Sequence, residues 1–249
     1  MKKIVITTII ATIGALALAQ NQSYKTGLEV MQAAYDRPTP KSSIGTLNLE
    51  ISKNGQTLSR TMKSWASNDR SLIKFLAPAD IKGSGILSIK KNGVTETLLY
   101  LPALGRTRRL ATGGGDSSDC DGAFFGSDFS YCDLGRSDIK DFNYNLLSSD
   151  NDKYIIEAKA KKGNSYDKIV FEIENKTLNT LKTDYYKGDK VFKTLRALEM
   201  VVVKGYNVIK SLSMETISQG SKSTFKQTSI EMDVQIADSV FTERFLKQP

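Results

Sequence analysis

Histidine is absent from the 249-residue sequence. Its absence excludes the Ser-His-Asp and Cys-His catalytic arrangements, zinc sites with histidine ligands and the commonest general base at neutral pH. Paired carboxylates or a lysine could still serve an enzyme, but nothing in the sequence specifies such a pair. The sequence therefore favours binding over hydrolytic chemistry, and we expect no catalytic residue, no cofactor and no metal.

Cysteine is scarce as well, since Cys120 and Cys132 are the only two. Both lie in one irregular segment, where they either close a small loop in an oxidising compartment or stay as free thiols. A disulfide there would stabilise the fold by about 3 kcal/mol, by restricting the unfolded chain. Two cysteines alone make a poor metal site.

Long apolar runs are confined to the amino terminus. Lys2 and Lys3 precede an uncharged stretch over residues 4–18, and Ala17-Leu18-Ala19 fits the small-residue pattern before a signal-peptidase site. The stretch is shorter than the ~20 residues that a spanning helix needs. We therefore expect residues 1–19 to be a cleavable signal peptide of an exported, soluble protein.

Charge of one sign is only mildly in excess, with a formal net charge of +8. Most lysines alternate with apolar residues, as they do on the solvated face of a strand. Attraction to anionic lipid head groups or to an acidic partner is the alternative interpretation. Because no dense basic block is present, we expect no nucleic-acid partner.

The sequence does contain one predicted helix, followed by segments with the two-residue periodicity of β-strands. Residues 21–36 carry apolar side chains at helical spacing and precede Arg37-Pro38, which predicts an amphipathic helix. The pattern then alternates with period two, and Asn54-Gly55 and Asn92-Gly93 predict tight hairpin turns. We predict a single, mainly β domain over residues 20–249, with about ten or eleven antiparallel strands in a strongly curved sheet or open barrel.

A middle segment over residues 102–140 shows neither period. Four aromatic residues fall between Phe124 and Tyr131, so this stretch is either a plug over the core or a lid over an apolar cavity. Residues 117–128 imitate an EF-hand calcium loop only in part, because no predicted helices flank them. A long irregular segment inside a compact domain usually has a function.

Four segments that follow the predicted signal peptide and first helix are informative about the protein's family. They are Phe75–Gly83, Tyr100–Arg109, Phe125–Leu134 and Phe241–Leu246. Together they resemble the outer-membrane lipoprotein-sorting proteins of the periplasmic lipoprotein-carrier (LolA-like) superfamily. Two positions depart from that family: Cys132 stands where glutamate is usual, and Leu98 where tryptophan is frequent. The first departure argues against a shared role for the acidic position.

The resemblance implies an unclosed, highly curved antiparallel barrel whose concave apolar face is covered by an N-terminal helix and a loop or helical lid. It also implies a periplasmic carrier, or chaperone, that shields the acyl chains of a lipoprotein or lipid between an inner-membrane exporter and an outer-membrane acceptor. We expect a monomer. Two alternatives stay open: an accessory subunit of an inner-membrane exporter that carries nothing, and an envelope enzyme that uses aspartates of the middle segment.

Strand alternation and these motifs select the candidate residues. The candidate cargo cavity comprises Leu47, Leu49, Ile51, Trp65, Ile73, Phe75, Leu99 and Leu101. The candidate lid comprises Phe125, Phe129 and Tyr131, with Gly113–Gly115 as its hinge. The candidate docking rim, which would face a membrane or a partner, comprises Arg106, Arg108 and Arg109.

Overall fold

A short helix precedes the sheet in the computed structural model, which describes residues 24–92, 94–112, 122–131, 133–134, 139–162 and 164–248. Helix α1 (Gly27–Tyr35) begins where Thr26 and Glu29 form a capping box. The Thr26 side chain accepts a hydrogen bond from the Glu29 amide at 3.2 Å, and the Glu29 carboxylate accepts one from the Thr26 amide. The helix therefore starts at residue 27, later than the predicted range of 21–36.

All strands of the described chain belong to one 13-stranded antiparallel sheet, in the order β6-β5-β4-β3-β2-β1-β13-β12-β11-β10-β9-β8-β7. Their bounds are β1 Ser42–Lys53, β2 Gln56–Ser67, β3 Arg70–Ala77, β4 Gly85–Lys91, β5 Val94–Leu101, β6 Arg106–Thr112, β7 Phe142–Ser149, β8 Lys153–Ala160, β9 Lys168–Glu174, β10 Thr180–Lys187, β11 Lys190–Val203, β12 Tyr206–Thr216 and β13 Ser221–Met232. Because the edge strands β6 and β7 do not pair with each other, the barrel is not closed. The predicted fold class is confirmed, but the sheet has 13 strands where about ten or eleven were predicted.

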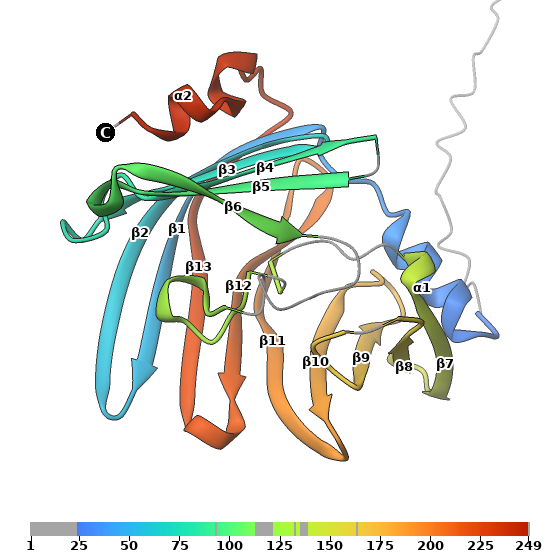
Figure 1. Cartoon of the computed structure of the whole chain (residues 1–249). Helices are drawn as coiled ribbons and strands as arrows, with labels where there is room; N and C mark the ends of the chain where they lie inside the picture. The colour runs from blue at the N-terminus through green and yellow to red at the C-terminus, as the bar shows by residue number, and fades with distance from the viewer. Residues whose placement is uncertain are drawn as a thin grey trace, which may run out of the picture.

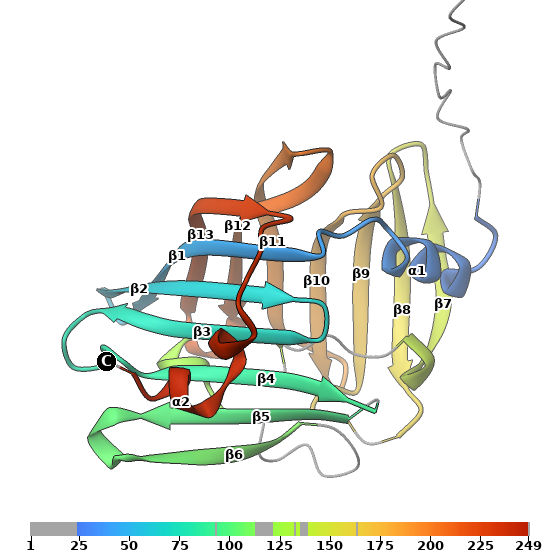
Figure 2. The same cartoon turned by 90° about the horizontal axis from the view of Figure 1, so that it is seen from above.

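The sheet curves so strongly that its two edge strands, β6 and β7, lie on different sides of its concave face (Figures 1 and 2). Strands β1 and β13 form the middle of the sheet, and their pairing joins the first half of the chain to the second. Neighbouring strands are mostly linked by tight turns, as at Asn54 and Gly55, whose φ values of 52° and 74° are left-handed. Because of this curvature, segments outside the sheet can cover an apolar surface on its concave face.

Helix α1 covers one end of the concave face. Val30 is fully buried against Tyr154, Ile156 and Ile173 of β8 and β9. Gly27 lets the helix approach closely, since a Cβ at this position would lie 2.9 Å from the backbone carbon of Asn145. In the described part of the chain, no helix has the length and apolar character needed to cross a membrane.

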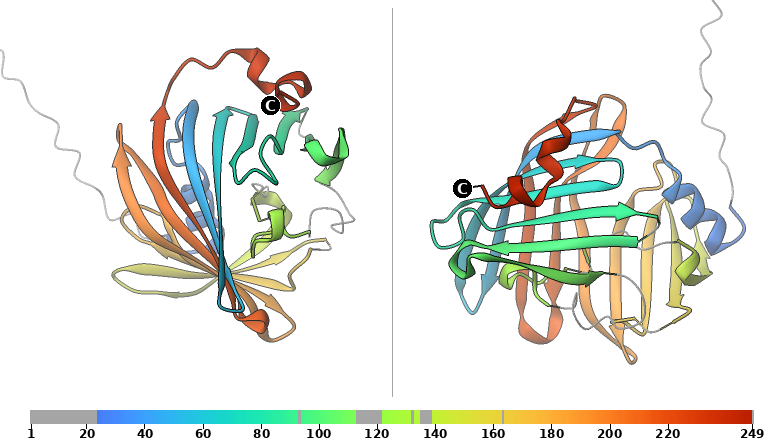
Figure 3. Two further views of the ribbon diagram at one scale, coloured as in Figure 1. Left: turned by 90° about the vertical axis from the view of Figure 1, so that its left-hand side faces the viewer. Right: turned by 45° about the horizontal axis from the view of Figure 1, so that its top comes forward.

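The carboxyl-terminal segment packs on the opposite, convex face (Figure 3). It comprises a 3-10 turn, Asp238–Phe241, and helix α2, Glu243–Leu246. Phe241 and Leu246 are buried against Leu72 and Leu87 of the sheet. A Cβ on Gly85 would lie 2.7 Å from the Ile73 carbonyl oxygen of the neighbouring strand and 2.9 Å from Leu246 Cδ1, so a glycine is needed at this position under the helix. The part of the convex face around β3 and β4 is thus covered by the carboxyl-terminal segment.

Candidate functional site

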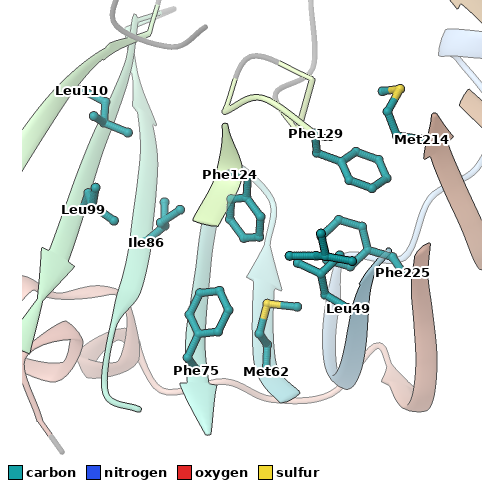
Figure 4. Close-up of a cluster of buried hydrophobic side chains, with 11 residues drawn as sticks. Leu49, Met62, Phe75, Ile86, Leu99, Leu110, Phe124, Phe129, Met214 and Phe225 are labelled. Carbon is teal, nitrogen blue, oxygen red and sulfur yellow. The ribbon is translucent and has the colours of Figure 1, made fainter. Parts of the chain in front are cut away.

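The concave face contains the largest cluster of buried apolar side chains, which we call the concave cluster (Figure 4). Its members come from eight strands and from the segment between β6 and β7: Leu49, Ile51, Met62, Phe75, Ile86, Leu99, Leu110, Phe124, Phe129, Met214 and Phe225. Alternation places them on one side, since successive side chains of a strand point to opposite faces. A continuous apolar surface therefore crosses the middle of the sheet.

Residues 122–131, which we call the aromatic loop, cover this surface. Phe124 is 0% exposed and Phe129 is 1% exposed. The Phe124 ring centroid lies 5.9 Å from that of Phe75, and the Phe129 centroid lies 4.7 Å from that of Phe225. The loop turns sharply at Phe125 and Gly126, which have φ values of 48° and 78°. In this structure the chain's own aromatic side chains occupy the concave face.

Polar contacts attach the aromatic loop to β13. The buried carboxylate of Asp128 accepts hydrogen bonds from the Ser221 hydroxyl and, at 2.6 Å, from the Ser223 hydroxyl. The Ser223 hydroxyl also accepts a bond of 2.9 Å from the Asp128 amide. A buried carboxylate is stable only when its oxygens have donors, so these serines fix the position of the loop.

A second buried carboxylate lies just beyond the loop. Asp133, whose side chain is 1% exposed, accepts hydrogen bonds from the Ser130 amide at 2.7 Å and the Tyr166 hydroxyl at 2.9 Å. The Lys193 ammonium lies 3.4 Å from the same carboxylate. Burial, and then the charge of Asp133, raises the pKa of the Tyr166 hydroxyl far above its usual value. Tyr166 is therefore a hydrogen-bond donor that does not ionise in the physiological range.

Seven of the eight predicted cavity residues lie on the concave face. Leu49, Ile51, Phe75 and Leu99 are members of the concave cluster, and three more pack against it with partial exposure: Leu47, Ile73 and Leu101. They are covered by the aromatic loop, so the structure brings them together around a filled apolar surface. Whether that surface receives cargo is a question of function.

Trp65 is the exception: it lies on the convex face, so the prediction that it lines the cavity was wrong. It packs with the convex-face cluster, and its ring lies 5.8 Å from Phe245 of α2 in an edge-on arrangement. The apolar residues of β2 include Met62 and Trp65, which are three positions apart. Because faces alternate with period two, these side chains point to opposite sides. Met62 occupies the concave position instead.

The three predicted lid residues all belong to the aromatic loop. Phe129 is fully buried, while Phe125 and Tyr131 pack against the concave cluster with partial exposure. Burial raises the pKa of the Tyr131 hydroxyl, an effect opposed by a hydrogen bond with the Phe125 backbone and by the charge of Arg108. These contacts describe a plug that fills the face rather than a cover above an empty space.

The three arginines of the predicted rim belong to a strand that sequence analysis treated as irregular. Strand β6 is an edge, paired only with β5. Arg106 and Arg108 lie opposite Leu101 and Leu99, and therefore on the concave side. Arg109 lies opposite Leu98 and pairs with Glu96 at 2.7 Å. Two of the three arginines thus lie on the concave face of this edge strand, and Arg109 lies on its convex face.

Several predictions fall on residues that the structure does not describe. They are the signal peptide over residues 1–19, the hinge Gly113–Gly115, the cysteines Cys120 and Cys132, and residues 117–121 of the partial calcium motif. Among the described residues, no group of three histidine, cysteine, aspartate or glutamate side chains is close enough to bind a metal ion. The disulfide and the hinge stay predictions.

Sequence analysis missed several residues of this face. Met214 and Phe225 come from β12 and β13, and their alternation with polar neighbours is a signal that could have placed them. Phe124 stood inside the aromatic motif but was left out of the lid. The pair of Asp133 and Lys193 had no local signal, because 60 positions separate the two residues in the chain.

Comparisons with known proteins place this geometry in a family. A protein-family model described as "-like: Uncharacterized protein" matches residues 67–248, most of the chain. A DUF1329 family protein from Desulfovibrio piger is 25% identical with a TM-score of 0.80, and the match covers 88% of this chain and 97% of that one. No curated protein matches the sequence.

Two further solved structures share the fold. A domain described as an outer membrane lipoprotein-sorting protein, from Vibrio parahaemolyticus, is 24% identical with a TM-score of 0.80, covering 89% of this chain and 98% of that one. A LolA superfamily protein from Nitrosomonas europaea is 16% identical with a TM-score of 0.69, covering 89% and 100%. Nearly the whole of each neighbour is matched, so the shared fold extends over the entire sheet.

Proposed function

We propose a carrier function for this chain, which belongs to the family matched over residues 67–248 and has the fold of the LolA-like lipoprotein-sorting proteins. The protein takes up an acyl chain of a lipoprotein or lipid on its concave face and shields it from water in the periplasm. An inner-membrane exporter supplies the cargo and an outer-membrane acceptor receives it. The chemistry requires no catalytic group.

One observation supports this proposal most directly: the concave face is a broad apolar surface covered by a separate loop. The loop's two fully buried aromatic residues, Phe124 and Phe129, stand where an acyl chain would lie. Burying each ring stabilises the covered state by about 1.5–3 kcal/mol. An acyl chain of ~14 carbons gains about 11 kcal/mol at ~0.8 kcal/mol per CH₂, before entropy costs. The gross gain from an acyl chain therefore exceeds the gain from burying the two rings, as displacement of the loop requires.

A titration with a fluorescent fatty acid tests both the binding and the displacement. We expect the Phe129→Ala variant to bind the probe more tightly than wild type, because the loop competes less strongly. A loss of about 2 kcal/mol in loop packing raises apparent affinity up to ~30-fold if the covered state dominates. Phe245→Ala removes a similar ring on the convex face and is the matched control, expected to leave affinity unchanged.

The outcomes separate the alternatives. Absence of probe binding to wild type would contradict the carrier function and favour an accessory subunit that carries nothing. Binding that is unchanged or weakened in Phe129→Ala would show that the aromatic loop does not compete with the ligand, even though the concave face accepts it.

A further inference from the structure

A polar cavity of about 380 Å³ lies beside the aromatic loop on the concave face. Loop residues form one wall, and the ends of β1, β10, β11 and the β12–β13 hairpin form the other. Eleven of its fifteen lining residues carry polar side chains, so an acyl chain itself is a poor occupant. The volume equals that of roughly twelve water molecules at ~30 Å³ each, which is ample for a charged head group.

Three lysine residues line this cavity: Lys53, Lys187 and Lys193. Lys193 has Asp133 as a partner, at 3.4 Å. Lys53 donates a hydrogen bond of 3.0 Å to the Gln219 side chain, which is neutral. Within the described ranges, neither Lys53 nor Lys187 has a carboxylate at ion-pair distance. Positive charge at the cavity is therefore in excess.

A β-bulge concentrates the lysines at this place. Lys193 lies opposite Tyr185, whereas Val191 lies opposite Tyr186, so that Phe192 is an extra residue in β11. Consecutive residues Phe192 and Lys193 can then both line the cavity, which regular alternation would prevent. The Lys187 ammonium lies 4.4 Å from the Phe192 ring centroid. The ring thus positions a second cation at the same wall.

The remaining lining groups are compatible with an anion. Asp128 is the one carboxylate among the described lining residues, and its oxygens already accept hydrogen bonds from Ser221 and Ser223. Hydroxyl groups of Ser165 and Thr216 also line the cavity. Ammonium and hydroxyl donors together bind phosphate oxygens through strong, charge-assisted hydrogen bonds.

The cavity also adjoins apolar surface on two sides. Ile51 belongs to the concave cluster, while Tyr166 belongs to a second buried cluster on the same face, with Phe142, Ala158 and Ile169. We propose that the cavity binds the phosphate head group of an amphiphile whose acyl chain lies on the concave cluster. This proposal rests on the carrier function and specifies its cargo as a phosphate-bearing lipid.

Calorimetric titration with two lipids tests it: a 1-acyl-glycerol 3-phosphate with a 12-carbon chain, and the 1-acyl-glycerol with the same chain but no phosphate. We expect wild type to bind the phosphate form about tenfold more tightly, or more, with a preference that falls as salt is added. The Lys53→Gln/Lys187→Gln double variant should lose the preference. Lys222→Gln/Lys226→Gln, exposed on the convex side of β13, removes equal charge and should keep it.

Each outcome decides between the proposals. Equal affinity of wild type for both lipids, or a preference that survives Lys53→Gln/Lys187→Gln, overturns the head-group site while the carrier function stands. Failure of both lipids to bind overturns both proposals. Inorganic phosphate is titrated in parallel, and binding as tight as that of the phosphate lipid would assign the cavity to free phosphate and overturn the head-group site.

Discussion

Replacing Asp128 with asparagine should release the aromatic loop while leaving the sheet folded. Asp128 is 7% exposed, and its carboxylate accepts hydrogen bonds from two hydroxyls of β13, those of Ser221 and Ser223. A hydrogen bond to a charged group contributes about 1.5–3 kcal/mol and a neutral one about 0.5–1.5 kcal/mol, so Asp128→Asn weakens loop docking by about 2 kcal/mol. That loss corresponds to a ~30-fold increase in the open population of the loop.

Hydrogen exchange at loop amides measures this population. The Phe124 amide donates to the Phe129 carbonyl at 2.7 Å, and the Tyr131 amide donates to the Gly122 carbonyl at 3.1 Å. Both amides should exchange about 30-fold faster in Asp128→Asn, because they exchange through local opening. Amides of β1 and β13, which are central in the sheet, should keep their rates.

A control and a contrary result complete the test. Asp238→Asn removes an exposed carboxylate that pairs with Arg70 at 2.7 Å on the convex side, and it should leave loop exchange unchanged. Unaltered exchange of the Phe124 amide in Asp128→Asn would refute the role of Asp128 as an anchor. Equal acceleration throughout the sheet would show instead that the loop is part of the global folding unit.

Other predictions follow from the convex face and from the surface charges. Gly85→Ala should lower the free energy of unfolding by about 1–3 kcal/mol in a urea titration, since the added Cβ would lie 2.7 Å from the Ile73 carbonyl oxygen and 2.9 Å from Leu246 Cδ1. Trp65→Ala should destabilise the fold by about 3 kcal/mol yet leave fatty-acid affinity unchanged. The hydrogen bond from Lys153, which lies 2.8 Å away, lowers the pKa of the Glu172 carboxyl. This hydrogen bond therefore stabilises the folded protein at pH values above the usual glutamate pKa. The stabilisation is lost as the pH falls through the lowered pKa of Glu172. Glu172→Gln should reduce the loss of unfolding free energy on acidification by about 0.5 kcal/mol, measured from urea titrations at several pH values.

The sheet could be predicted because its signals are local. Alternation identifies most strands, and the Asn54-Gly55 turn fixes the β1–β2 register, in which Lys53 pairs with Gln56. Strand β6 was missed because an edge strand needs few apolar residues, and its Arg-rich sequence buries only Leu110 among the side chains described there. Local patterns therefore predict interior strands better than edges.

The site was less predictable because its contacts join distant parts of the chain. Trp65 was misplaced because neighbouring apolar residues of β2 face opposite sides, and only the paired strands decide which side is concave. The anchor between Asp128 and Ser223 connects residues 95 positions apart. The β-bulge at Phe192 depends on the pairing of β10 with β11. These contacts depend on which strands pair and in which register, and the sequence alone does not determine either.

Hydrogen exchange of residues 122–131, measured with and without a saturating acyl ligand, is the decisive experiment for the carrier function. We predict that the loop amides exchange faster when the ligand is bound, because the acyl chain replaces Phe124 and Phe129 on the concave face. Loop amides that stay as protected in the complex as in the free protein would show that the ligand does not displace the loop.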